Sequence, residues 1–171
     1  NTQDIVVSLP RYPQHLDDDV SRHLGPACGV LPLPIAGNPT EGFTLVLMSY
    51  PGSGNAKAKE GLGLRDVVVF YLAMDPKMMR EVVLVWNGDA NSLPPLVKTL
   101  TTEAEVPTAD NRTATVLGRL RVVCMASNSL FNRFDPRLEP RTQAMVLSDD
   151  DTRIDEGTLK VGYAKWCCGN A

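Results

Sequence analysis

Short apolar runs recur along the chain, and polar or turn-forming residues close each of them. Runs that are apolar throughout are typical of strands covered on both faces, as in a parallel sheet between two layers. The pattern predicts four strands, at residues 42–50, 81–87, 120–125 and 143–148. Proline and glycine break every apolar run in residues 1–41, so we expect an irregular leader there.

The segments between the predicted strands differ in character. Apolar positions at helical spacing predict a helix over residues 57–74. An early proline indicates a short helix over residues 93–100, and a further helix is expected over residues 156–166. The polar stretches 101–119 and 127–134 are expected to be a long loop and a connection. Because strands alternate with helices or connections, the order is that of a βαβ sheet. We therefore expect an α/β domain over residues 42–171.

Polar side chains gather at the points where the predicted strands end. Tyr50, Asn87, Asn128 and the run Asp149-Asp150-Asp151 each follow a strand. The carboxyl ends of neighbouring parallel strands meet at one end of a sheet, and ligands of such sheets bind outside that end. We therefore expect these side chains to face one crevice.

The three consecutive aspartates are the candidate metal site. In extended backbone Asp149 and Asp151 leave on one face and Asp150 on the other. Carboxylates held together repel one another unless they share a cation. Carboxylate oxygens suit Mn²⁺ or Mg²⁺ that bridges to a substrate phosphate. The alternative is a solvated turn or helix cap, and the triplet Asp17-Asp18-Asp19, which follows no apolar run, is expected to face water.

Two asparagines and one arginine are candidate nucleotide ligands. The amides of Asn87 and Asn128 donate and accept at once, as contacts to a base or ribose require. The planar fork of Arg133 matches a phosphate group. The alternatives are that Asn87, which precedes a glycine, is a turn residue and that Arg133 forms a surface ion pair with Asp135.

Composition narrows the choice of partners. A net charge of −3 provides no basic surface for nucleic acid. No run approaches the roughly 20 apolar residues that cross a bilayer. The four cysteines include no C-x-x-C pair, which argues against structural zinc, and Cys124 is expected to be a small buried residue. Asn111-Arg112-Thr113 is a glycosylation acceptor sequence, which favours a secretory lumen.

Taken in order, these stretches resemble the exostosin-related glycosyltransferases of family 64. The resemblance rests on residues 43–50, 83–87, Asn128 with Asn132-Arg133, and 146–152. The helix expected near the C-terminus also resembles the one that follows the acidic motif of that family. The similarity therefore extends from about Gly42 to the end of the chain.

The resemblance implies a GT-A (Rossmann-like) fold for nucleotide-diphospho-sugar transfer. It implies transfer of a sugar, N-acetylhexosamine or a related one, from a UDP donor to a glycan or glycolipid acceptor. The reaction would need Mn²⁺, with Mg²⁺ as a possible substitute, and would retain the anomeric configuration. Family members are anchored in the endoplasmic reticulum or Golgi, so the chain is expected in the lumen and attached to the membrane only through a segment that it lacks.

The resemblance also implies roles for individual residues. Asn87, Asn128 and Arg133 match positions that hold the uridine nucleotide. The run Asp149-Asp150-Asp151 matches the D-x-D motif, whose last acid is the expected direct metal ligand. Asp149 and Asp150 are expected on the donor, with Asp149 also beside the metal.

Two features depart from the family pattern. Tyr50-Pro51-Gly52 stands where relatives have a Tyr-Asn-Arg type sequence, so an expected arginine contact to the donor is missing. The chain also ends soon after Trp166, so we expect a truncated domain whose catalytic side chains lie beyond Ala171. Two other interpretations stay open. In the first, the chain is a UDP-binding fragment without activity. In the second, it is a haloacid-dehalogenase-like phosphatase, a class in which Asp149-x-Asp151 after a strand would be the nucleophile pattern.

Overall fold

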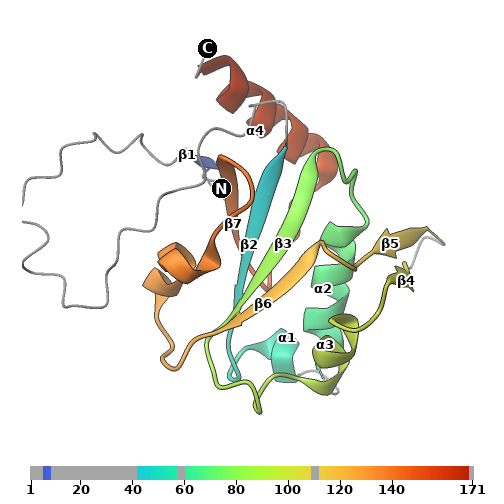
Figure 1. Cartoon of the computed structure of the whole chain (residues 1–171), viewed down its shortest axis with the longest axis vertical. Coiled ribbons are helices and arrows are strands. Elements are labelled where there is room, and N and C mark those ends of the chain that lie inside the picture. Colours follow the sequence, from blue (N-terminus) through green and yellow to red (C-terminus); the bar gives the residue numbers. More distant parts are fainter. Residues whose placement is uncertain (1–5, 9–41, 58–60, 109–111, 170–171) are drawn as a thin grey trace, which may run out of the picture.

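The computed structural model describes residues 6–8, 42–57, 61–108 and 112–169 (Figure 1). The predicted leader lies outside the described residues except at 6–8, as do the aspartates at 17–19 and Asn111. Over the described residues the chain forms a mixed α/β fold around a mostly parallel sheet. The predicted fold class is confirmed at this level.

The central sheet has the strand order β1-β7-β2-β3-β6. Four strands run parallel to one another: β7 (Ala144–Asp149), β2 (Phe43–Ser49), β3 (Met79–Trp86) and β6 (Leu120–Cys124). They are the four predicted apolar runs. The prediction succeeds because β2, β3 and β7 are largely buried and β6 is half-buried, which selects mostly apolar side chains.

A fifth strand, β1 (Val6–Ser8), lies inside the predicted irregular leader. It runs antiparallel to β7, with Val6 opposite Val146. Its residues are too few to stand out from their proline-rich surroundings, but pairing with the outer side of β7 satisfies backbone groups of both strands. The prediction of irregular structure is therefore wrong at residues 6–8.

The helices of the described chain are α1 (Gly54–Lys57), α2 (Leu62–Leu72), α3 (Pro95–Leu100) and α4 (Glu156–Gly169). The three predicted helices are confirmed, but α2 begins later than the predicted residue 57. Gly61 has a left-handed φ of 87°, and a Cβ there would lie 2.2 Å from Cβ of Pro94. The helix therefore begins beyond Gly61. None of the helices in the described ranges has the length and apolar character to cross a membrane.

The two faces of the sheet are covered by different kinds of structure. Helices α2, α3 and α4 cover the first face and form the larger core with it (Figure 1). The second face is apolar at Val46, Met48, Val83 and Val85, and these residues pack with Leu138. Leu138 belongs to the β6–β7 connection (residues 125–143), which contains the short 3₁₀ helices η3 (Leu130–Phe134) and η4 (Pro136–Leu138). Among the described residues, the second face is therefore packed by a connection and not by a helical layer.

The predicted loop over residues 101–119 contains a small antiparallel ladder. It consists of β4 (Glu105–Pro107) and β5 (Thr113–Thr115), with Val106 opposite Ala114. Both central residues are buried in the larger core. Each strand contributes only one buried side chain, so no alternating pattern could reveal it, and the prediction of a plain loop is wrong here.

Candidate functional site

The carboxyl ends of the parallel strands meet at one end of the sheet, which we call the carboxyl end. Residue pairing brings Met48 beside Asp149 and Ser49 beside Trp86, while Trp86 pairs with Cys124. The residues that follow these positions are therefore neighbours in space although they are distant in sequence. In the part of the chain that is described, the strand-end polar residues therefore gather at one end of the sheet, and the crevice expected between them stays a prediction.

Asn87 is the centre of an asparagine cluster at this end. Its side chain is buried, and its Nδ2 donates to Oδ1 of Asn128 at 3.1 Å. Its Oδ1 accepts a hydrogen bond from Nδ2 of Asn132 at 2.7 Å. Its backbone N–H donates to the carbonyl of Ser49, the last residue of β2. Asn87 is thus held from three sides, and Asn128 is left exposed at the surface of the cluster.

Arg133 lies beside this cluster and reaches toward the aspartates. Its Nη2 donates to Oδ1 of Asp149 at 2.8 Å and lies 3.8 Å from Sδ of Met48. The arginine side chain is 18% exposed and the aspartate side chain 53% exposed. The predicted surface pairing of Arg133 with Asp135 is wrong, because Asp135 pairs with Arg137 instead. Arg133 therefore faces the carboxyl end of the sheet.

Asp150 points the other way, as the alternation along a strand predicts. It is buried, and its Oδ2 accepts hydrogen bonds from the hydroxyls of Ser49 and Ser53 at 2.6 and 2.5 Å. Its backbone carbonyl accepts from Nδ2 of Asn55, and its N–H donates to the carbonyl of Met48. These contacts engage the Asp150 carboxylate in the turn that follows β2.

Asp151 is exposed and its Oδ1 accepts a hydrogen bond from the hydroxyl of Thr152 at 3.2 Å. Tyr71 of α2 supports the same loop from the first face of the sheet. Its hydroxyl donates to the carbonyl of Thr152 and accepts from the N–H of Ile154, both at 3.1 Å. The loop after β7 is therefore held by the Asp150 contacts on one side and by Tyr71 on the other.

The three carboxylates do not converge on one point. Across the described ranges, no group of three or more histidine, cysteine, aspartate or glutamate side chains is placed to hold a metal ion. Asp150 is engaged by two serines, which leaves Asp149 and Asp151 as the exposed acids of the run. Metal binding by these two residues stays a prediction.

Sequence reasoning assigned no role to Asn132, Ser49, Ser53 or Asn55. Asn132 fixes the orientation of the Asn87 amide, while the other three hold Asp150. The spacing of Asn128 and Asn132, four residues apart in a polar connection, is a signal that could have identified Asn132. The serines offer no comparable signal, because Ser-containing turns are common after any strand.

A cavity of about 330 Å³ lies at the opposite end of the sheet. None of the predicted site residues lines it; its lining residues are Pro76, Arg80, Leu117, Gly118, Arg119, Arg141 and Thr142. Arg119 donates to the carbonyls of Leu72 and Met79, and burial lowers the pKa of its guanidinium. This arginine is therefore engaged by the main chain and does not mark the predicted site.

Residues 43–168 match the family model described as Glycosyl transferase family 64 domain. The chain belongs to glycosyltransferase family 64. Comparison with the curated proteins gives no match. The family match extends from β2 into α4 and so includes the whole carboxyl end of the sheet. As a member of family 64 the chain is of the transferase class, which favours that interpretation of the Asp149–Asp151 pattern over the phosphatase one.

Proposed function

We propose that this family 64 domain binds the UDP part of a nucleotide sugar at the carboxyl end of its sheet. The observation that carries the proposal is the placement of the Asn87 cluster next to the Arg133–Asp149 pair. Amide groups that recognise a nucleoside and charged groups that recognise a diphosphate are thus adjacent. In the proposal the domain transfers N-acetylhexosamine or a related sugar to a glycan or glycolipid, with retention, in a GT-A fold.

The asparagines are the proposed nucleoside contacts. Asn128 is exposed, and its Oδ1 accepts a hydrogen bond from Asn87. The amide N–H groups of Asn128 can therefore donate to a base or ribose. Asn132 holds the buried Asn87 amide in one orientation and so keeps Asn128 in place. Arranging polar groups before the ligand arrives reduces the entropy cost of binding.

Asp149 and Asp151 are the proposed metal ligands. Carboxylate oxygens are the ligands that Mn²⁺ and Mg²⁺ prefer, and both acids are exposed beside the strand end. The bound ion would neutralise the diphosphate and stabilise the charge on the departing nucleotide. Asp150 is engaged in its turn, and we propose that it acts by fixing the direction of its two neighbours rather than by contacting the donor.

The Arg133–Asp149 ion pair supports an exchange of partners on binding. Each group neutralises the other in the unliganded chain, at a place where the aspartate is more than half exposed. A diphosphate carrying a divalent cation offers both groups a new partner, since the arginine fork suits phosphate and the carboxylate suits the cation. The exchange leaves neither charge unpaired.

Calorimetry with UDP and Mn²⁺ tests this proposal. The chain is expected to bind UDP only when Mn²⁺ is present. Asp149→Asn should weaken the binding about tenfold or more, because it removes one of the two proposed carboxylate ligands, and loss of even an outer partner of a metal site costs about 10–100-fold in metal affinity. The matched control is Asp66→Asn, which removes an exposed aspartate that also pairs with an arginine, Arg65, on α2. It should leave the UDP affinity unchanged.

Two results would contradict the proposal. One is the absence of UDP binding by a folded chain. The other is Mg²⁺ binding without preference for uridine, together with hydrolysis of an aryl phosphate, which is the behaviour of a phosphatase. Binding of UDP with no transfer from a UDP-sugar would support the nucleotide site and identify the chain as the inactive fragment.

We place the activity in the lumen of the endoplasmic reticulum or Golgi, and lumenal glycosylation at Asn111 would support that location.

A further inference from the structure

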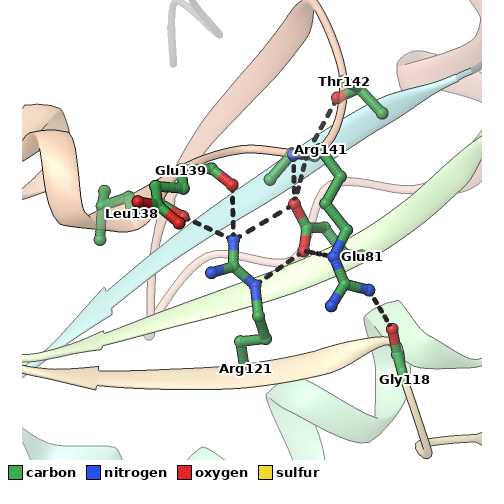
Figure 2. A network of polar contacts seen from close by, with 8 residues as sticks. Glu81, Gly118, Arg121, Leu138, Glu139, Arg141 and Thr142 are labelled. Carbon is green, nitrogen blue, oxygen red and sulfur yellow. Dashed lines mark hydrogen bonds and ion pairs between the residues drawn. The ribbon is translucent and has the colours of Figure 1, made fainter. Parts of the chain in front are cut away.

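A buried group of charges lies near the other end of the sheet, which we call the amino end (Figure 2). Glu81 of β3 is fully buried between Arg121 of β6 and Arg141 of the β6–β7 connection. Its Oε2 lies 3.0 Å from Nε of Arg121 and 3.5 Å from Nε of Arg141. Its Oε1 accepts from the backbone N–H of Arg141 at 2.7 Å and from the hydroxyl of Thr44 at 3.0 Å. Both carboxylate oxygens are thus occupied.

Stability alone is a weak explanation for this cluster. Burying charges is energetically costly, and well-packed apolar residues often replace such a group without loss of stability. Glu81 lies two residues before Val83 on the same strand, so its side chain shares the second face of the sheet with the small apolar core. A larger apolar core could have extended there. The cluster therefore suggests a geometric role.

Its contacts hold the end of η4. Nη2 of Arg121 donates to the carbonyls of Leu138 and Glu139, at 2.5 and 3.0 Å. Glu139 has a left-handed φ of 40°, the one positive φ at a non-glycine residue in the described ranges. Such a conformation costs energy and persists only where the surroundings impose it. Arg121 on one side and Arg141 on the other supply that constraint (Figure 2).

The held segment is the one that carries Arg133 and Asn132. Asp135 ends η3 and caps η4 through the N–H of Arg137, so the two 3₁₀ helices form one continuous unit. Leu138, the last residue of η4, packs into the small core on the second face of the sheet. Only five residues lie between Arg133 and Glu139, and so short a segment limits how far one end can move relative to the other. The unit is thus fixed at the amino end by Glu81 and meets Asp149 at the carboxyl end.

We propose that Glu81, through Arg121 and Arg141, is a positioning residue for the donor site. It holds η4 so that η3 presents Asn132 to Asn87 and Arg133 to the diphosphate. The inference rests on the proposed UDP site for its functional consequence, but the anchoring of the connection is a separate physical statement. In the contacts of the described residues, Glu81 itself touches none of the residues that are predicted to bind the sugar donor.

Glu81→Gln tests the proposal because it keeps the shape of the side chain and removes its charge. Amide hydrogen exchange of residues 129–139 is expected to rise about tenfold or more, while the cores of β2 and α2 stay protected. The affinity for UDP with Mn²⁺ should fall about tenfold. Arg121→Lys is the second variant. It keeps the positive charge but loses the guanidinium fork, whose Nε binds Glu81 while its Nη2 binds the two carbonyls, so the same two changes should appear in weaker form.

Val97→Ala is the matched control. Val97 is fully buried on α3, on the first face of the sheet, so the variant loses stability without touching the connection. Its UDP affinity and its exchange at residues 129–139 should equal those of the parent chain. A change in both would mean that any loss of stability loosens the segment, which overturns the proposal.

The outcomes are separable. Unchanged exchange at residues 129–139 in a folded Glu81→Gln chain overturns the proposal, and so does faster exchange with unchanged UDP affinity. If Glu81→Gln fails to fold, Arg121→Lys decides by the same two measurements. If the parent chain binds no UDP, the proposed function fails. The exchange measurement then still decides whether Glu81 anchors the connection.

Discussion

The two ends of the sheet use the same residue types in opposite ways. At the carboxyl end Arg133 pairs with Asp149, whose side chain is 53% exposed. At the amino end Arg121 pairs with Glu81, whose side chain has no exposure at all. An exposed pair contributes about 0–1 kcal/mol and is easily exchanged for other partners, whereas a buried carboxylate that loses a partner is costly. The comparison teaches that exposure, not pairing itself, separates the charge that we propose to bind a ligand from the charge that we propose to anchor the connection.

Removal of the buried carboxylate should have the largest effect on stability. Glu81→Ala leaves Arg121 and Arg141 without their common partner, so the free energy of unfolding should fall by about 3–5 kcal/mol. The exposed counterpart Asp149→Ala should change it by less than about 1 kcal/mol. Chemical denaturation followed by circular dichroism measures both. Equal losses at the two positions would remove the distinction between the ends.

Substitutions of the adjacent residues Asp150 and Asp151 should differ by a smaller amount in their effect on the free energy of unfolding. Asp150→Ala leaves the buried hydroxyls of Ser49 and Ser53 without their acceptor, so unfolding should become easier by about 1–3 kcal/mol. Asp151→Ala removes an exposed side chain and should cost about 0.5 kcal/mol or less. Thermal denaturation of the two variants side by side is sufficient. A greater loss for Asp151 would show that the run is oriented differently from the hydrogen bonds described here.

Acidification should have the smallest effect on stability. It acts at Asp135, which joins η3 and η4, the segment that links the two ends of the sheet. Hydrogen bonds from Arg137 hold the pKa of Asp135 below its ordinary value. The resulting stability is complete above the ordinary aspartate pKa, and it is lost as the pH falls through the lower pKa of the folded chain. The pair is partly exposed and screened by solvent, so the loss is less than about 1 kcal/mol.

The comparison of the parent chain with Asp135→Asn measures the stability that the ionised Asp135 side chain contributes. The parent chain should be slightly more stable in urea at pH 7, and the difference should shrink below about pH 4 as Asp135 gains a proton. A difference that grows on acidification would have the wrong sign for a carboxyl group with a lowered pKa.

The sequence predicts the carboxyl end of the sheet better than the amino end, for physical reasons. The four parallel strands are mostly apolar on both faces, so the apolar run indicates where each strand lies, and the polar residue that follows marks the strand end. The opposite directions of Asp149 and Asp150 follow from the two-residue period of a strand. These features are local, and a single segment contains the information.

The anchoring cluster is not local. Glu81 appears in the sequence only as the first residue of an apolar run, while its partners Arg121 and Arg141 lie 40 and 60 residues away. No pattern within one segment joins them. The engagement of Asp150 is similarly hidden, because Ser49 and Ser53 belong to another strand end. β1 and the β4–β5 ladder were missed because each strand has three residues.

The central claim is that a divalent ion and a nucleotide bind at the carboxyl end. Paramagnetic broadening of backbone amide NMR signals by Mn²⁺ in the presence of UDP tests it most directly. The account predicts saturable broadening centred on residues 149–152 and extending to Asn87 and Arg133, with the signals of residues 118–121 and 139–141 at the amino end unchanged. Broadening centred on the amino end, or none that saturates, would contradict it.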